Sequence, residues 1–258
     1  MRERFLTQIK LDDKAPKICV SFFGEDFALA KDMYRSLKEE AADILEWRLD
    51  YLMGEAYRDT SAIEAFLGEL RREGEERPLI LTLRTEEEGG RARLSSREYR
   101  NIIRDLITDT EADAIDMEAF DREPGGESDV VAFLTSLSHE NDKAVILSNH
   151  DYTGMPSQRE ILSRLLAMEK LGADVPKAAY MARTKEEAET LLSAAQEAGE
   201  ILSVPFIALA MGEAGTPTRI AAGLFGSCIT FAAAGRGGTA PGQLSVAETR
   251  QHLKTFYQ

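Results

Sequence analysis

Residues 143–181 read KAVILSNHDYTGMPSQREILSRLLAMEKLGADVPKAAYM. Both ends of this stretch, 143–150 and 174–181, are short apolar runs of the kind that forms buried strands. Residues 157–171 between them have the amphipathic pattern of a helix, and Ser157 can cap its first turn. The stretch therefore predicts one strand–helix–strand unit.

The same unit recurs along the chain in both directions. Apolar runs return roughly every 25–35 residues, the spacing of a strand–helix unit, and amphipathic stretches such as 26–41, 96–108 and 185–198 lie between them. The predicted strands are 17–22, 44–50, 78–84, 113–119, 143–150, 174–181, 203–211 and 227–233. We expect residues 1–258 to form one domain, a (β/α)₈ TIM barrel, which typically needs about 250 residues. A doubly wound open sheet is the alternative, but eight units favour closure.

The composition of the chain limits which partners and locations are expected for it. With 43% hydrophobic and 29% charged residues, the chain has the make-up of a soluble globular protein. A net charge of −14 argues against nucleic-acid binding. The charged start, MRERFLTQIK, and the absence of an apolar run of about 20 residues indicate neither a secretory signal nor a membrane span. Cys19 and Cys228 have no metal or disulfide spacing, so we expect buried thiols and a cytoplasmic location.

Charged residues alternate with apolar ones inside two of the predicted strands. Glu46, Arg48 and Asp50 share one face of 44–50, and Asp116 and Glu118 share one face of 113–119. In a barrel the apolar face packs against the helices, so these polar side chains are expected to point inward. They lie toward the carboxyl ends of their strands, where barrel active sites are built.

Three further polar residues lie within or at the end of other strands: Arg84, His150 and Lys177. Charges at strand ends are often only the first solvated residues of a loop. The combination on five strands instead indicates a polar functional cavity, because unpaired buried charge costs several kcal/mol.

Lys177 is the candidate nucleophile, since a lysine in the middle of a parallel strand is covered on both faces. Apolar neighbours and nearby arginines would favour its neutral amine form. The alternative is a structural lysine paired with Glu46 or Asp116. His150 is the candidate proton shuttle.

The remaining histidines, His139 and His252, fall in helical stretches and are expected at the surface. No spacing typical of a catalytic metal is present, so we expect no metal. Glu46 and Glu118 remain an alternative pair for a divalent ion.

Two features of the carboxyl-terminal part suggest ligand capture. The Gly-rich stretch GRGGTAPGQ, residues 235–243, can fold over a bound ligand. Arg219, after the seventh strand, suits a carboxylate or a phosphate.

Several segments together resemble class I 3-dehydroquinate dehydratases. They are ILEWRLD, ILTLRTEEEGG, DAIDMEAF, VILSNHDY, ADVPKAAYMA and RIAAGLFGSCITF followed by TAPGQ, in order from about Lys17 to Gln243. The patterns EWRxD, SxHD and TAPGQ are specific in combination.

The resemblance implies a TIM barrel, a homodimer, and catalysis without metal or cofactor. It implies a lyase of the shikimate pathway that dehydrates 3-dehydroquinate to 3-dehydroshikimate through an imine on Lys177, with His150 as general acid and base. The other residues that the resemblance assigns are substrate contacts at Ser21, Glu46, Arg48, Arg84, Arg219, Thr239 and Gln243, acidic neighbours Glu88 and Asp116, and apolar walls Met211 and Phe231.

One departure concerns the loop. Thr239 stands where the family often has Ser, and GRGG before it is about one residue longer. Two rival functions remain at this point. A Schiff-base aldolase uses the same fold but usually holds a phosphate after strands 7 and 8. A non-catalytic barrel would trap no imine.

Overall fold

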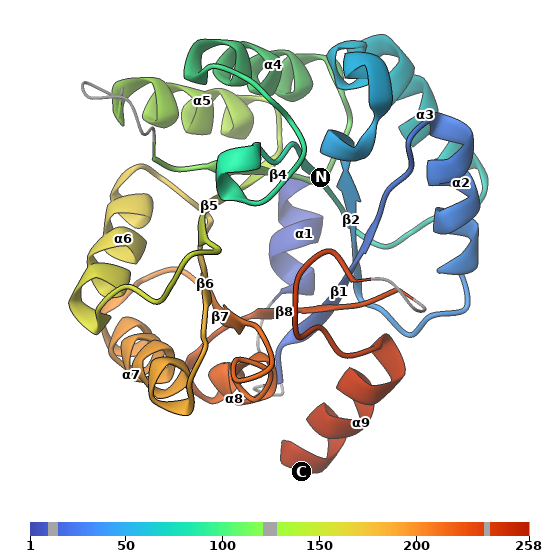
Figure 1. Ribbon diagram of the computed structural model, residues 1–258. Helices are drawn as coiled ribbons and strands as arrows, with labels where there is room; N and C mark the ends of the chain where they lie inside the picture. Colours follow the sequence, from blue (N-terminus) through green and yellow to red (C-terminus); the bar gives the residue numbers. More distant parts are fainter. Residues whose placement is uncertain (10–14, 121–127, 235–237, 258) are drawn as a thin grey trace.

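A computed structural model describes residues 1–9, 15–120, 128–234 and 238–257. Eight parallel strands follow one another in the order β7-β6-β5-β4-β3-β2-β1-β8 (Figure 1). The ring closes between its ends, where a parallel bridge joins Phe206 to Ser227 and the Cys228 N–H donates to the Phe206 carbonyl at 2.8 Å. Their bounds are β1 (Lys17–Phe22), β2 (Ile44–Arg48), β3 (Leu79–Thr82), β4 (Ala114–Glu118), β5 (Ala144–Asp151), β6 (Val175–Met181), β7 (Ile207–Met211) and β8 (Ile229–Ala232). The predicted (β/α)₈ barrel is confirmed, and every predicted strand is present.

Helices surround the ring of strands (Figure 1). They are α2 (Phe27–Ser36), α3 (Thr60–Arg72), α4 (Ser96–Asp109), α5 (Ser128–Glu140), α6 (Gln158–Lys170), α7 (Lys185–Ile201), α8 (Thr218–Ala221) and α9 (Val246–Phe256), with α1 (Arg2–Gln8) at one end of the barrel. Short 3₁₀ helices are η1 (Leu49–Tyr51), η2 (Met53–Arg58), η3 (Glu86–Glu88) and η4 (Ala222–Phe225). Among the described residues, no helix is both long and apolar enough to cross a membrane.

The local sequence explains where these helices begin. Serines before α4, α6 and α9 each form a reciprocal capping box with a glutamate three residues later, as in the pair Ser157 and Glu160. Helix α2 is shorter than the expected 26–41, because the Arg77 guanidinium binds the Leu37 and Glu40 carbonyls (3.1 and 3.5 Å) where the chain turns away.

Alternation along the strands separates two layers of side chains. Leu45 and Trp47 of β2 belong to the core between strands and helices, and Ile115 and Met117 of β4 join them. Other apolar residues, such as Ile146, fill the inside of the ring. The polar residues of the same strands therefore point inward, as predicted.

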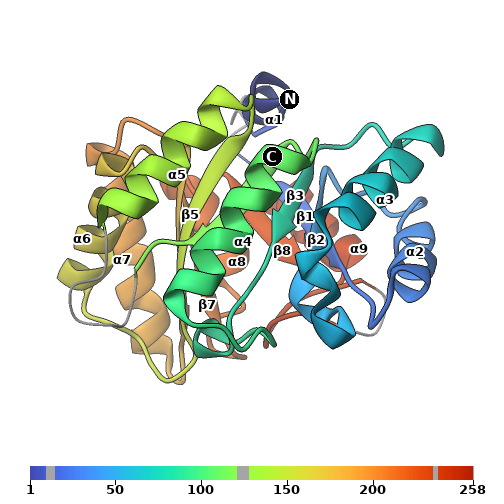
Figure 2. The same ribbon diagram turned by 90° about the horizontal axis from the view of Figure 1, so that it is seen from above.

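Helix α1 closes the end of the barrel where the strands begin (Figure 2). Phe5 and Ile9 pack into the inner cluster, and neither is more than 1% exposed. Arg2 and Arg4 form ion pairs with Asp174 and Asp113, which directly precede β6 and β4. Helix α1 therefore fills the inside of the ring at this end.

The structure corrects one expectation about the histidines. His252 is exposed as expected, but His139 is half-buried and its Nε2 lies 3.0 Å from Asp174. Helix α5 turns this residue toward the buried carboxylate, so His139 belongs to the closed end of the barrel.

Candidate active site

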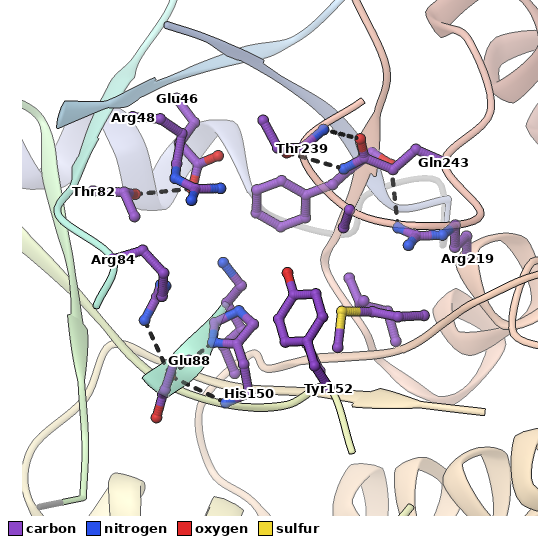
Figure 3. Close-up of a pocket in the computed structure, with 16 residues that line it drawn as sticks. Glu46, Arg48, Thr82, Arg84, Glu88, His150, Tyr152, Arg219, Thr239 and Gln243 are labelled. Atoms are coloured by element: carbon purple, nitrogen blue, oxygen red, sulfur yellow. Dashed lines mark hydrogen bonds and ion pairs between the residues drawn. The ribbon is translucent and has the colours of Figure 1, made fainter. Parts of the chain in front are cut away.

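A cavity of about 450 Å³ lies at the carboxyl-terminal ends of the strands (Figure 3). Its walls come from six strands and the loops that follow them. The lining residues are Glu46, Arg48, Thr82, Arg84, Glu88, His150, Tyr152, Lys177, Ala179, Leu209, Met211, Arg219, Phe231, Thr239, Ala240 and Gln243.

Lys177 is the only lysine among the described residues that line the cavity, and it is 4% exposed. It lies in the middle of β6, and its Nζ donates to Asp116 Oδ2 at 2.7 Å. The same Nζ lies 4.3 Å from the centre of the Phe231 ring. Of the two carboxylates that the sequence left open as partners of Lys177, the structure selects Asp116.

Asp116 lies under the cavity and joins three groups. Besides Lys177, its Oδ1 accepts from Arg84 and from the Ser148 hydroxyl, both at 2.6 Å. Burial alone would raise the pKa of this carboxyl, but Arg84 and Lys177 hold the pKa well below its usual range. Asp116 therefore remains ionised and supplies a fixed negative charge beside the amine.

His150 is held by Glu88 from the η3 turn. Glu88 Oε2 lies 2.9 Å from His150 Nδ1 and also accepts the His150 N–H at 3.1 Å. Burial, followed by the charges of Arg84 and Lys177, lowers the pKa of His150 well below its ordinary value. The imidazole is therefore neutral near pH 7, and Nε2 is the ring nitrogen that Glu88 does not contact.

Glu88 shares the buried network with a second carboxyl, Glu118. Burial and then the Glu118 charge raise the pKa of Glu88 to about 8, although Arg84 at 3.2 Å opposes that shift. Glu118 itself accepts from Thr85 and Arg84, so it is not turned toward Glu46. The described residues contain no group of three or more His, Cys, Asp or Glu side chains arranged to hold a metal.

Glu46 and Arg48 line the opposite wall from β2. Glu46 accepts from Thr82 at 2.8 Å and from the Ser21 hydroxyl. Arg48 forms a two-pronged pair with Asp50, with both distances at 2.8 Å. Both charged groups are thus fixed in direction before any ligand binds.

Arg219 differs from the other arginines of the cavity. It is 3% exposed and donates only to the carbonyls of Phe231 (3.5 Å) and Pro241 (3.0 Å). Within the described residues it has no carboxylate partner, and its buried Nε has no hydrogen bond. Burial lowers its pKa to about 10. This guanidinium is arranged to receive an anion.

The loop beside Arg219 is folded over the cavity and held by its own side chains. Gln243 Oε1 accepts the Thr239 N–H at 2.8 Å, and its Nε2 lies 3.4 Å from the Thr239 hydroxyl. Thr239 also lies 3.3 Å from the Ser21 hydroxyl, which connects the loop to β1. Gly235, Arg236 and Gly237, which carry the predicted extra length, lie outside the described residues.

Most residues singled out from the sequence meet in this cavity. Ser21 and Asp116 are not among its lining residues, but they form hydrogen bonds with Glu46 and Lys177, respectively. Sequence reasoning missed Thr82, Tyr152, Ala179, Leu209 and Ala240 as lining residues. The alternation of side chains could have found all of these except Ala240, because each lies two positions from a residue that the sequence did single out.

Known proteins resemble the whole chain. The family model of type I 3-dehydroquinase matches residues 18–258. The 3-dehydroquinate dehydratase of Listeria monocytogenes serotype 4a is 35% identical over 258 residues, covering 100% of this chain and 99% of that protein. The enzyme of the same name from Salmonella typhimurium is 36% identical over 259 residues, with 100% of both chains covered.

Solved structures agree with the sequence comparisons. The type I 3-dehydroquinate dehydratase of Clostridium difficile, solved with covalently modified comenic acid, is 33% identical with a TM-score of 0.85, covering 94% of this chain and 92% of that one. The 3-dehydroquinate dehydratase of Geobacillus kaustophilus is 31% identical with a TM-score of 0.84, covering 94% and 93%. The chain therefore belongs to the type I 3-dehydroquinase family.

Proposed function

We propose that this enzyme dehydrates 3-dehydroquinate to 3-dehydroshikimate in the shikimate pathway, through an imine on Lys177 with His150 as general acid and base. The observation that carries the proposal is the joint presence in one cavity wall of a buried primary amine, a neutral imidazole and an arginine without a described carboxylate partner. Family membership supplies the reaction.

The first step joins Lys177 to the substrate. The Lys177 ammonium gives up a proton and its Nζ attacks the C3 carbonyl carbon. The carbonyl oxygen takes up that proton and a second one from Nζ and leaves as water, so a cationic imine remains. Asp116, which faces Nζ at 2.7 Å, would then stabilise the imine cation as it stabilises the ammonium. The cationic imine accepts the electrons released when the neighbouring C–H bond breaks.

His150 moves the protons of the second step. Its lowered pKa keeps the imidazole neutral, and Nε2, the ring nitrogen that Glu88 does not contact, would take the C2 proton and generate an enamine. The imidazolium then returns the proton to the C1 hydroxyl, which departs as water while the enamine electrons reform the imine. Hydrolysis of that imine frees the product and the Lys177 amine.

The remaining groups orient the substrate. We assign Arg219 to the C1 carboxylate, because Arg48 and Arg84 already have carboxylate partners. Glu46 and Arg48 would contact ring hydroxyls, and Thr239 and Gln243 would close over the ligand. Met211 and Phe231 supply apolar walls. Such orientation lowers a barrier by several kcal/mol.

The test is an absorbance assay for the conjugated product with purified protein and 3-dehydroquinate. We expect turnover, and borohydride added with substrate should inactivate the enzyme. Strong inhibition by inorganic phosphate with no turnover would instead favour a phosphate-binding Schiff-base aldolase. Absence of both turnover and any trapped adduct would favour a non-catalytic barrel.

We further propose that residues 1–258 act as a single catalytic domain, that the enzyme works as a homodimer and that it resides in the cytoplasm. Family resemblance supports the dimer. Light scattering coupled to size exclusion tests it, with a mass of about twice the 28.6 kDa chain expected, and a monomer at micromolar concentration would contradict it.

A further inference from the structure

Tyr152 directly follows β5 and lines the cavity, yet no step above uses it. Its hydroxyl points into the cavity from the wall that carries His150 (Figure 3). No hydrogen bond joins this hydroxyl to any residue in the described part of the chain, in contrast to Tyr180 and Tyr257, whose hydroxyls bond to Asn149 and Ile220. The cavity therefore presents a phenol that has no partner until a ligand enters.

The ring of Tyr152 is fixed in this orientation. It packs against the inner apolar cluster and lies so close to Gly89 that a Cβ on this glycine would approach Tyr152 Cε2 to 2.1 Å. Gly89 has a φ of 81° and ends the η3 turn that carries Glu88. The turn and the ring thus hold each other, and the hydroxyl cannot easily swing out of the cavity.

The electrostatic surroundings indicate what the hydroxyl can bind. Burial raises the pKa of Tyr152, so the group stays a neutral phenol and a hydrogen-bond donor. Tyr152 and Arg219 line the same cavity, and the two groups lie close enough to interact electrostatically. An anion seated on Arg219 therefore lies in the part of the cavity toward which the phenol points.

We infer that Tyr152 is a substrate-contacting residue whose hydroxyl donates a hydrogen bond to the carboxylate that Arg219 binds. The inference rests on the proposed function, which supplies the carboxylate. It gives that carboxylate two donors of different kinds, a guanidinium from the loop after β7 and a phenol from the end of β5. Their separation on two walls would fix the angle at which the substrate lies over Lys177.

The experiment compares steady-state kinetics of Tyr152→Phe with the wild-type enzyme. The ring and its contact with Gly89 remain, so melting temperature should not change. We expect KM to rise about tenfold, the scale of one hydrogen bond to a charged group, with kcat within about twofold. Borohydride should still trap the adduct at saturating substrate. Tyr57→Phe, a buried tyrosine outside the cavity lining, is the matched control and should keep wild-type constants.

A double-mutant cycle with Arg219→Lys tests whether both groups hold the same carboxylate. We expect the two changes together to weaken kcat/KM less than the product of the single effects. An unchanged KM in Tyr152→Phe, a loss confined to kcat, or fully multiplicative effects in the cycle would each overturn the inference. A wild-type protein that does not turn over 3-dehydroquinate would instead remove the proposed function, so the two failures are distinguishable.

Discussion

Where the strands begin, several donors surround the buried carboxylates of Asp113 and Asp174. Where the strands end, the buried Arg219 guanidinium donates, within the described part of the chain, only to main-chain carbonyls. Asp113 accepts from Arg4, Arg71 and the Leu79 N–H at 2.5–2.9 Å. The Asp174 carboxylate likewise contacts Arg2 of α1 and His139 of α5.

The difference shows which end of the barrel serves stability and which serves binding. Because Asp113 and Asp174 already have these donors, neither carboxylate needs a ligand. At the other end, an unsatisfied guanidinium and an open phenol retain a cost of burial that a bound anion would relieve.

The largest effect is expected at the open end. His150→Ala removes the proton-transferring base but leaves the Lys177 amine, so turnover should fall roughly 10²–10⁴-fold while an imine still forms. Stopped-flow absorbance measures the turnover, and borohydride trapping checks the imine. Near-normal turnover would mean that another group moves the protons.

A substitution at the closed end should change the stability of the protein rather than its kinetic constants. Asp113→Asn removes the charge that holds Arg4 and Arg71, both of which reach solvent and can rehydrate. We expect the free energy of unfolding to drop by about 2–3 kcal/mol, with kcat/KM unchanged below the new transition. A loss of kcat/KM without loss of stability would contradict the division between the two ends.

Arg219→Lys should show the opposite pattern to Asp113→Asn, with a loss of kcat/KM and no loss of stability. A lysine cannot reproduce a planar two-pronged grip on a carboxylate, so kcat/KM should fall by a factor equivalent to about 1–3 kcal/mol. Stability should stay the same or increase, because the native guanidinium is incompletely satisfied. Wild-type kinetics in this variant would remove Arg219 as the carboxylate anchor.

The smallest expected effect is a change in the free energy of unfolding with pH. The pKa of Glu88 is raised to about 8 by burial, so its contribution to stability is complete below its ordinary value and is lost as pH rises toward 8. The pKa of His150 is lowered, so its effect on stability has the opposite sign. The contribution of His150 to stability is lost as pH falls below the ordinary pKa of an imidazole.

Between about pH 6.5 and 8, only Glu88 of this pair is expected to change stability. Relative to Glu88→Gln, the wild type should therefore lose about 1–2 kcal/mol of unfolding free energy over that window. Urea titrations at several pH values measure this difference, and constant offsets between the proteins cancel. Parallel pH profiles would show that Glu88 keeps an ordinary pKa.

Much of the fold and of the site was predictable because strand alternation is a local signal. Because side chains alternate along a strand, Glu46, Arg48 and Lys177 could be assigned to the inside of the barrel from their positions in the sequence. Tyr152 has the same parity as His150, but the predicted strand stopped at His150 while β5 continues to Asp151.

Other features have no local signal. Helix α1 has only seven residues, too few to be stable alone, and forms because Phe5 and Ile9 find room under the strands. Which carboxylate pairs with Lys177, and which arginine has none, depends on distances between strands that no single stretch of sequence encodes.

The central claim is that Lys177 is the nucleophile. Its most direct test is peptide mapping by mass spectrometry after borohydride reduction of the enzyme with 3-dehydroquinate, performed on the wild type, Lys177→Ala and His150→Ala. The account predicts a reduced adduct on Lys177 in the wild type and in His150→Ala, and neither adduct nor turnover in Lys177→Ala. An adduct on another lysine, or substantial turnover by Lys177→Ala, would contradict it.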